Sequence, residues 1–346
     1  MARSTVYNNI VSPEKLNDVN PDNMELGEDW LEYLQSIDRS PESIKAYRND
    51  LKIFWVWNSE FNKNKFFTDL TKREIAKFQN HAINVWKWSP NRIRRVKSCL
   101  SSLSNYIENV LDDEEEFKNF KPIVRKIENP VKEPVREKTV LPDEDIDRLL
   151  EILTEREEYE KACAVAIAAY SGMRKSELLQ MKVKYFDDDH FVYDAMWKTD
   201  KIRTKGNGRL GKQLSKFILY GAKPYIDRWL NYRKEHGIDS EWMFVTRTRN
   251  KDGTYSYHPR KDLSSWTEEF GEILGVDFYM HCLRHFTCTK LHRMNLPSHV
   301  IQEFFGWSSS EMLQIYNDLT AEDEFGKYFD KNGIKSVEHG TLSQSY

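Results

Sequence analysis

A charged, proline-bearing segment over residues 111–140 interrupts the periodic pattern of this chain and divides it into two folding regions. The segment begins with the acidic run LDDEEE and continues as KPIVRKIENPVKEPVREKT, which has three prolines and little periodicity. Such a composition favours an extended linker, and 346 residues exceed one ordinary domain. The sequence therefore predicts domains at 24–110 and 141–330, a flexible leader at 1–23 and a loose tail at 331–346.

The first region carries a helical pattern. Ser40 and Ser89 each place an N-capping hydroxyl directly before a proline, which suits the first turn of a helix. Thr71 and Glu74 fit a capping box. Apolar residues follow these starts at steps of three and four, which indicates one buried stripe on each helix. The sequence predicts a small helical bundle over residues 24–110.

The stretch WKWSPNRIRRVK, at the start of the last of these helices, is the most basic stretch of the region. A helix N-terminus favours phosphate, and arginines can add charge-assisted hydrogen bonds. The pattern suggests a patch that contacts DNA, although a solvated helix face explains it equally well. The candidate DNA-binding residues are Lys87, Arg92, Arg94, Arg95 and Lys97.

The second region has a mixed pattern. An amphipathic helix starts at Pro142 and Asp143, and the alanine-rich stretch Lys161–Tyr170 indicates a buried helix that ends at a Ser-Gly turn. Over residues 190–220, β-branched and aromatic residues are broken by TKGNGRLGK, which is typical of a hairpin with a basic, glycine-rich tip. Helical patterns then resume. The predicted fold class is mainly α with a small antiparallel β-sheet.

Composition narrows the classes of protein that fit. The net charge of −3 gives no global sign of nucleic-acid binding, so such binding would depend on local clusters. No apolar run approaches the ~18 residues of a membrane helix, and the N-terminus lacks the apolar core of a signal peptide. The four cysteines lie in or beside apolar stretches, which favours a reducing compartment over a disulfide framework. We therefore expect a cytoplasmic protein.

Three segments far apart in the sequence carry the candidate chemistry. They are YSGMRKSELL with Arg174 and Glu177, HCLRH with His281, Arg284 and His285, and FFGWSSSEMLQIY with Tyr316. Each has an ordinary explanation alone, as a surface arginine, a pair of histidines on one helix face, or a packed tyrosine. The histidine spacing also suits a zinc hydrolase, but HCLRH lacks the glutamate of HExxH and no CxxC pair accompanies it.

Taken together, the three segments resemble the motifs of the tyrosine recombinase (phage integrase) family. SGMRKSEL resembles that family's first arginine motif, HCLRH its His-x-x-Arg motif, and GW followed nine residues later by Tyr316 its final motif. RSPESIKAYRNDLKIF resembles the start of the family's helical core-binding domain, so the resemblance spans about residues 25–330. It implies a SAM-like N-terminal domain and an α+β catalytic domain that form a C-shaped clamp on DNA.

The resemblance implies roles for four side chains around one phosphate. Arg174 and Arg284 would clamp its nonbridging oxygens, a task that suits the fork geometry and permanent charge of a guanidinium. His281 would donate to the phosphate or help move the proton of the nucleophile. Tyr316 would attack the phosphorus and form a covalent phosphotyrosine.

Three further residues are expected to support this set. Trp307 stands where most family members have histidine, and its indole N–H can hold a phosphate oxygen but cannot shuttle a proton. Glu177 is expected to orient Arg174 or a neighbouring group, and His285 to buttress the site through a hydrogen bond. Ser308 and Glu311 fit a capping box that would start the helix bearing the tyrosine.

In the family, a lysine on a β-hairpin gives a proton to the leaving 5′-oxygen. The TKGNG turn resembles that element most closely, so Lys205 is the expected donor. The distance in sequence from Arg174 is long for this role, and Lys212 and Lys198 remain alternatives.

The implied function is site-specific DNA recombination, as in the integration of mobile genetic elements, through a 3′-phosphotyrosine and a Holliday junction. It needs neither ATP nor a metal or other cofactor. The implied partners are a double-stranded recombination site, further copies of the chain that make a homotetramer from monomers, and an accessory DNA-bending or directionality factor. On DNA, the protein would be nucleoid-associated. The alternatives are relaxation of DNA by a type IB topoisomerase-like enzyme and DNA binding by a non-catalytic relative.

Overall fold

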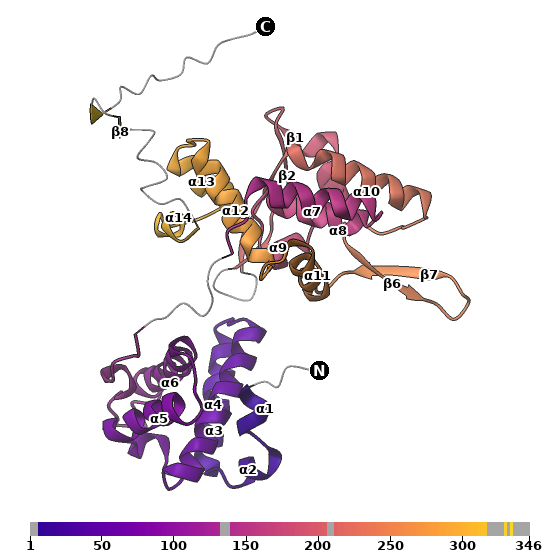
Figure 1. Cartoon of the computed structure of the whole chain (residues 1–346). Helices are drawn as coiled ribbons and strands as arrows, with labels where there is room; N and C mark the ends of the chain where they lie inside the picture. The colour runs from indigo at the N-terminus through magenta and orange to yellow at the C-terminus, as the bar shows by residue number, and fades with distance from the viewer. Residues whose placement is uncertain (1–5, 132–138, 206–210, 317–328, 331–332, 335–346) are drawn as a thin grey trace. The chain divides into compact units, whose positions relative to one another are not determined.

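The computed structural model describes residues 6–131, 139–205, 211–316, 329–330 and 333–334. The chain divides into two compact units (Figure 1). The N-terminal unit includes Met1–Glu137, and the C-terminal unit includes Lys138–Thr204 and Lys212–Tyr346. Within these described ranges, no helix is both long and apolar enough to cross a membrane.

Helices build the described part of the N-terminal unit (Figure 1). They are α1 (Val6–Ile10), α2 (Pro13–Asn17), α3 (Pro21–Ser36), α4 (Pro41–Phe61), the 3₁₀ helix η1 (Phe67–Asp69), α5 (Lys72–Asn84), α6 (Pro90–Val110) and η2 (Val124–Lys126). The long helices α3, α4 and α6 share one apolar core with α5. The predicted helical bundle is confirmed.

The helix starts in this unit follow from local capping. The Ser40 hydroxyl accepts from the backbone N–H of Ser43, and the Ser89 hydroxyl accepts from that of Arg92. The box between Thr71 and Glu74 is present in both directions. Each of these side chains satisfies an N–H that the helix itself leaves without a partner, so the predicted starts are confirmed.

Two stretches expected to lack a fold belong to this unit. The leader predicted over residues 1–23 contains α1, α2 and the first turn of α3, and it buries Ile10, Val11 and Val19. The linker predicted over 111–140 places Phe117 and Val124 in the same core. The prediction of a flexible leader does not fit its described residues, because helices as short as α1 and α2 leave no periodic pattern. The predicted linker is mostly turn and coil where it is described, but Phe117 and Val124 anchor it to the core.

The C-terminal unit combines helices with short antiparallel strands, which confirms the predicted fold class. Its helices are α7 (Asp143–Glu155), α8 (Tyr159–Ala169), α9 (Lys175–Leu178), η3 (Val183–Phe186), η4 (Asp188–His190), η5 (Tyr220–Ala222), α10 (Lys223–Glu235), α11 (Ser264–Leu274), α12 (Met280–Arg293), α13 (Ser298–Phe305) and α14 (Glu311–Tyr316). Its strands are β1 (Phe191–Val192), β2 (Met196–Lys198), β3 (Ile202–Thr204), β4 (Lys212–Leu214), β5 (Phe217–Leu219), β6 (Val245–Arg249), β7 (Tyr255–Pro259), β8 (Phe329–Asp330) and β9 (Gly333–Ile334).

Helix α8 is the centre of this unit. Every residue from Ala162 to Ala169 is buried, and α7, α10 and α12 pack around the helix. Alanine lets neighbouring helices approach closely, because its side chain ends at Cβ. The Thr287 hydroxyl of α12 donates to the carbonyl of Ala169 at 2.9 Å, which ties α12 to the last turn of α8.

The strands form small antiparallel sheets. β1, β2 and β5 make one sheet in that order, and β3 pairs with β4 and β6 with β7 as two hairpins. The basic tip predicted between β3 and β4 falls largely on residues 206–210, which lie outside the described residues. The tail predicted over 331–346 also lies outside them, apart from β9.

Candidate active site

The turn between α8 and α9 presents Arg174. Gly172 has a φ of +60°, and a Cβ added there would stand 2.2 Å from the ring of Phe305. Only glycine fits both the left-handed backbone and this contact. The chain therefore turns sharply at the end of α8, and Arg174 follows as the residue that caps α9.

Glu177 holds Arg174 through two groups. One carboxylate oxygen accepts from the backbone N–H of Arg174 at 3.0 Å, and the other accepts from Nη1 of its guanidinium at 2.8 Å. Glu177 is fully buried. Burial alone would favour its neutral form, but the charge of Lys216 and the hydrogen bonds from Arg174 keep the Glu177 pKa below its ordinary value. The carboxylate is therefore ionised and fixed.

Arg284, on α12, is fully buried and only partly hydrogen-bonded. Its Nη1 donates to the carbonyl of Gly172 at 2.6 Å. Its Nε and Nη2 have no hydrogen-bond partner among the described residues. Burial, followed by the charge of Arg174, lowers the pKa of Arg284 to about 10. A buried guanidinium with two free donors is costly unless an anion completes it.

Tyr316 lies against the same arginine. Its ring stacks on Trp307 with centroids 5.1 Å apart, and the Arg284 Cζ is 5.2 Å from its centroid. Its hydroxyl is 2.6 Å from Nε2 of His281, and the ring of His285 lies 4.7 Å away. The structure thus brings together the nucleophile, both histidines and one arginine of the predicted set.

The chain reaches Trp307 through a glycine that ends α13. Gly306 has a φ of +69°, and the N–H of Trp307 donates to the carbonyl of Gln302 at 2.9 Å. The Trp307 indole N–H is buried and has no hydrogen-bond partner among the described residues. At the start of α14, the N–H of Glu311 donates to Ser309 at 3.2 Å. The predicted capping by Ser308 is therefore replaced by its neighbour.

We expect the imidazole of His281 to titrate well below the ordinary range. Burial, reinforced by the charge of Arg284, lowers its pKa to about 4 from an ordinary value of 6.5. His281 is then neutral near pH 7, so Nε2 can accept a proton from Tyr316. Histidine NMR of the DNA-free protein, assigned with His281→Gln, measures this. Titration near the ordinary value would contradict the expectation.

The predicted proton donors lie on the β3–β4 hairpin and its neighbour. Lys205 is exposed at the end of β3, beside the residues that the structure does not describe. Lys212 is exposed on β4, and the Lys198 ammonium lies 5.8 Å from the ring centroid of Phe217. The structure does not choose among them.

Sequence reasoning missed Lys216. This lysine is almost fully buried, its Nζ donates to the carbonyl of Phe305 at 3.0 Å, and it lies 3.6 Å from the Glu177 carboxylate. A signal was present, because Lys216 directly precedes the apolar strand Phe217–Leu219 and lies two residues before Ile218, its inward residue. A lysine at an inward position indicates a buried charge.

The basic patch of the N-terminal unit is largely engaged within the fold. Lys97 is buried and donates to Gln79 and to the carbonyls of Ile127 and Glu128. Arg92 and Arg95 form ion pairs with Asp50, which is fully buried. Within the fold, these three predicted DNA-binding residues already have hydrogen-bond or ion-pair partners, although the side chain of Arg95 remains 50% exposed.

The other two members of the patch differ from these. Arg94 donates to the carbonyl of Pro130 at 3.0 Å, and Lys87 is exposed. Lys87 and Arg95 are thus the members of the predicted set that the fold leaves exposed, and of these two Arg95 is paired with Asp50.

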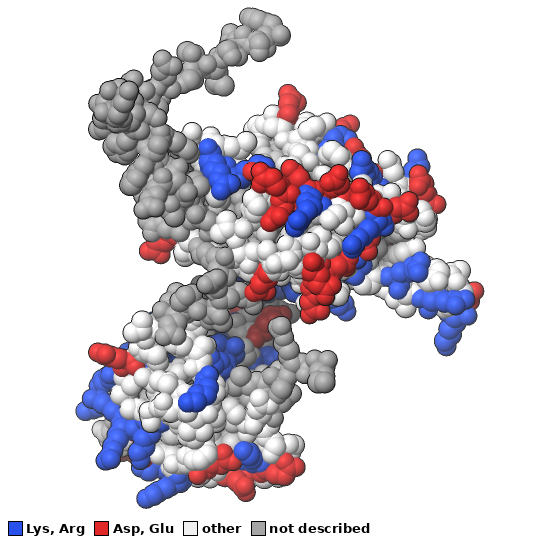
Figure 2. Space-filling view, in the orientation of Figure 1, with Lys and Arg blue, Asp and Glu red and all other residues white. Residues whose placement is uncertain are grey.

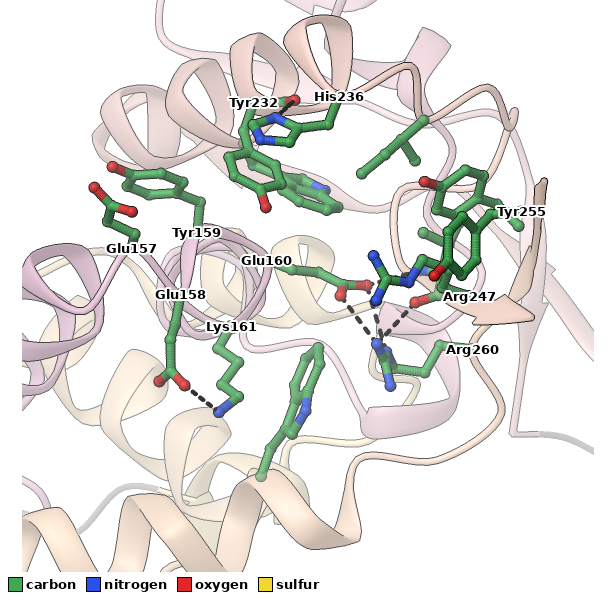
Figure 3. Close-up of a pocket in the computed structure, with 15 residues that line it drawn as sticks. Glu157, Glu158, Tyr159, Glu160, Lys161, Tyr232, His236, Arg247, Tyr255 and Arg260 are labelled. Atoms are coloured by element: carbon green, nitrogen blue, oxygen red, sulfur yellow. Dashed lines mark hydrogen bonds and ion pairs between the residues drawn. The ribbon is translucent and has the colours of Figure 1, made fainter. Parts of the chain in front are cut away.

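Two hollows of the C-terminal unit differ in their relation to this site. One is lined by Lys175, Tyr279 and His281, so it reaches the histidine that contacts Tyr316. The other surrounds Glu160 and Arg260 at the base of the β6–β7 hairpin and shares no lining residue with the first (Figure 3). The first hollow therefore borders the site at His281.

Two family models match the chain. The model of the phage integrase family matches residues 139–323. The model of the phage integrase N-terminal SAM-like domain matches residues 26–116. Together they cover both units.

Curated relatives match over most of their length. The SPbeta prophage-derived recombinase-like protein YomM of Bacillus subtilis is 27% identical over 75% of this chain and 76% of its own length. The tyrosine recombinase XerA of Thermococcus kodakarensis is 23% identical over 86% of this chain and 92% of its own.

Solved structures share the fold. A lambda integrase dimer bound to a COC′ core site has a TM-score of 0.59 at 16% identity, covering 90% of this chain and 99% of its own. A XerH site-specific recombinase in a post-cleavage complex with its difH substrate has a TM-score of 0.59 at 18% identity, covering 82% and 78%.

Proposed function

The chain belongs to the phage integrase family and is a tyrosine-type site-specific recombinase, and from this membership we propose that it cuts and rejoins duplex DNA through Tyr316. One observation supports this most strongly. Arg284 keeps two buried guanidinium donors without a partner directly beside the ring of Tyr316. A DNA phosphate has the charge and the acceptors that this place lacks.

The proposed first step transfers a phosphoryl group from DNA to the protein. The Tyr316 oxygen bonds to phosphorus while its proton passes to Nε2 of neutral His281. The bond from phosphorus to the 5′-oxygen breaks, and that oxygen takes a proton and leaves as a 5′-hydroxyl. Arg174, Arg284 and the Trp307 indole N–H donate to the nonbridging oxygens, where negative charge grows in the transition state.

The product is a 3′-phosphotyrosine, which retains the energy of the broken ester. A 5′-hydroxyl from another strand can then attack it and release Tyr316, so no ATP is consumed. Two such exchanges would pass through a Holliday junction. We propose that the reaction takes place on double-stranded DNA in a homotetramer assembled from monomers. The lambda integrase and XerH neighbours are themselves DNA complexes, which supports DNA as the partner.

The experiment that tests this function is a covalent trapping assay. The recombination site is mapped by sequencing the junctions formed when the gene is expressed beside its own flanking DNA. In a duplex of that site with a nick beside the cleavage position, cleavage frees a short fragment that carries the 5′-hydroxyl. Because this fragment dissociates, its hydroxyl cannot attack the phosphotyrosine, and the adduct is trapped. A denaturing gel should show protein joined to DNA. DNA binding without any adduct would instead support a non-catalytic relative.

Lys205 is proposed to give the proton to the leaving 5′-oxygen. Its replacement by alanine is expected to slow cleavage of an ordinary strand by about 10²- to 10⁴-fold, as for loss of a general acid. A strand with sulfur in place of that oxygen leaves as a thiolate and needs no proton, so the variant should cleave it at nearly the wild-type rate. Lys212→Ala and Lys198→Ala, measured beside it, identify the donor if the thiolate substrate rescues one of them instead.

The β6–β7 hairpin offers a DNA-contacting surface that sequence reasoning did not single out. Lys and Arg gather at its outer end (Figure 2). Arg249 ends β6, Lys251 lies in the turn that follows, and Arg247 lies at mid-strand over the ring of Tyr255. All three are exposed and have no acidic ion-pair partner among the described residues. Its base is fixed to α8, since Glu160 accepts from the Val245 N–H at 2.7 Å and from Arg260 at 2.9 Å (Figure 3). The hairpin is thus a basic arm on the helix that leads to Arg174.

Replacing Arg247, Arg249 and Lys251 together by alanine is expected to weaken binding to any duplex. Each lost phosphate contact should reduce the slope of log K against log salt by about 0.9, so the slope should flatten by about 2 to 3. Salt titrations of a fluorescent duplex measure this.

The matched control removes three lysines that already pair with acids in the same unit: Lys182, Lys184 and Lys223. Its salt slope should stay near that of the wild type. Equal slopes for the hairpin variant and the wild type would mean that the hairpin does not contact DNA.

A further inference from the structure

Lys216 is a buried cation to which the scheme above gives no role. Its side chain is 3% exposed. Its backbone N–H donates to the Thr199 hydroxyl and its carbonyl accepts from the Thr199 N–H, both at 2.9 Å. These two bonds fix the backbone immediately before β5, so the side chain leaves it in a defined direction.

The ammonium of Lys216 joins two parts of the site. Nζ donates to the carbonyl of Phe305 at 3.0 Å, on the turn that leads into Trp307, and it lies 3.6 Å from the Glu177 oxygen that also accepts from the Arg174 N–H. The turn comes this close because residue 306 is glycine. A Cβ there would stand 2.6 Å from Leu214 and 4.0 Å from Nζ.

The surroundings of Lys216 make its burial costly. Burial lowers the pKa of Lys216 to about 8, and the nearby charges of Arg284 and Arg174 act in the same direction, while Glu177 opposes them. Three cations therefore share one carboxylate. Glu177 already accepts from the backbone N–H and from one guanidinium nitrogen of Arg174. Without Lys216, the Glu177 oxygen that lies 3.6 Å from Nζ would lose its second cation, so the carboxylate could shift and engage more of the Arg174 guanidinium in competition with a phosphate.

We infer that Lys216 is a positioning residue for strand cleavage, because it fixes the carboxylate that orients Arg174 and, with the same ammonium, the turn that carries Trp307. This inference rests on the proposed function. Lys216 is proposed to act through Glu177 and the turn, without contact to the phosphate. It keeps the Glu177 carboxylate where Arg174 retains N–H donors for the DNA. It also keeps a constant distance between Glu177 and the turn that carries Trp307.

A rival role can be separated by chemistry. If Lys216 were instead the proton donor to the 5′-oxygen, its loss would be repaired by the thiolate-leaving substrate described for Lys205. A residue that positions Arg174 is needed for either leaving group, because the arginine acts on the nonbridging oxygens. The thiolate substrate therefore distinguishes the two roles directly.

The test measures single-turnover cleavage of the mapped duplex, with both leaving groups, by the full chain. Lys216→Met keeps the length of the side chain and removes its charge, and we expect an approximately 100-fold loss with either leaving group. Lys216→Arg should recover part of the rate. Duplex affinity should stay within about threefold of the wild type, because the exposed basic residues are unchanged.

Lys161→Met is the matched control. Lys161 is also a partly buried, ion-paired lysine of the C-terminal unit, bonded to Glu158 and Glu269, but it lies outside the site. It should cleave at nearly the wild-type rate once its fold is verified by thermal melting. If the Lys161 variant loses as much cleavage as Lys216→Met, the loss reflects general destabilisation and overturns the inference.

A double variant keeps the test valid if Lys216→Met folds poorly. Adding Glu177→Gln removes the carboxylate that would otherwise be left buried beside a missing cation, so the fold should recover while cleavage stays low. Because Lys216 acts through Glu177, the two losses should not multiply. Multiplying losses, rescue by the thiolate substrate, or normal cleavage by Lys216→Met would each overturn the inference. Absence of adduct with the wild type would instead refute the proposed function.

Discussion

Replacing Tyr316 by phenylalanine is expected to abolish the covalent protein–DNA adduct, with a loss of at least about 10⁴-fold in cleavage. The phenyl ring keeps the stacking on Trp307 and the contact with Arg284, so the site should retain its shape. Only the hydroxyl that meets His281 is removed, and loss of one hydrogen bond costs about 1 kcal/mol. The nicked duplex and a denaturing gel measure the adduct, and fluorescence anisotropy measures binding.

Tyr185→Phe provides the control for this substitution. Tyr185 is buried to a similar degree in the same unit, and it takes no part in the proposed chemistry. Its variant should form adduct at the wild-type rate. If Tyr316→Phe still formed an adduct, mass spectrometry of the DNA-linked peptide would identify another nucleophile and the proposed mechanism would be wrong.

The candidate site residues could be predicted from the sequence, because each proposed role restricts the type of residue that can fill it. A phosphate clamp requires arginine, and a phosphotyrosine requires tyrosine, so short motifs in the right order were informative. The structure adds their convergence: Gly172, which follows α8, supplies the carbonyl that holds Arg284 of α12. No spacing in the sequence predicts that contact, because Gly172 lies in the turn after α8 and Arg284 lies on α12, more than a hundred residues later.

Local structure was predictable where a side chain acts on its own helix. The hydroxyls of Ser40 and Ser89 cap the residues that follow them, so sequence alone identifies these starts. The helices of the leader were missed because α1 and α2 have five residues each, fewer than two turns. Such short helices depend on tertiary contacts, which no local pattern records. Ile10 at the end of α1 and Val11 after it are buried, and α2, which buries no residue of its own, contacts α4.

Two buried lysines show that a charged residue type does not by itself predict an exposed position. Lys97 follows Ile93 by four residues on the apolar stripe of α6, and Lys216 directly precedes β5. Lys97 points inward by helical periodicity, and Lys216 stands two residues before Ile218, the buried residue of β5. The residue type suggests an exposed cation, whereas the position in the sequence indicates a buried one. Both lysines are buried in the structure.

Arg284→Met is expected to separate activity from stability. In the wild type, the Arg284 guanidinium is fully buried beside other cations, and two of its nitrogens have no hydrogen-bond partner among the described residues. The substitution removes this buried charge, so the DNA-free variant should melt at the same temperature as the wild type or above it. Cleavage should fall by about 10³-fold or more, because the transition state loses a bidentate clamp. Arg284→Lys should not restore cleavage, since an ammonium keeps the charge but loses the fork of donors.

Sulfate, as a phosphate analogue, should raise the melting temperature of the wild type and leave that of Arg284→Met unchanged. A variant that unfolds readily yet cleaves normally per folded molecule would show that Arg284 serves the fold rather than the phosphate.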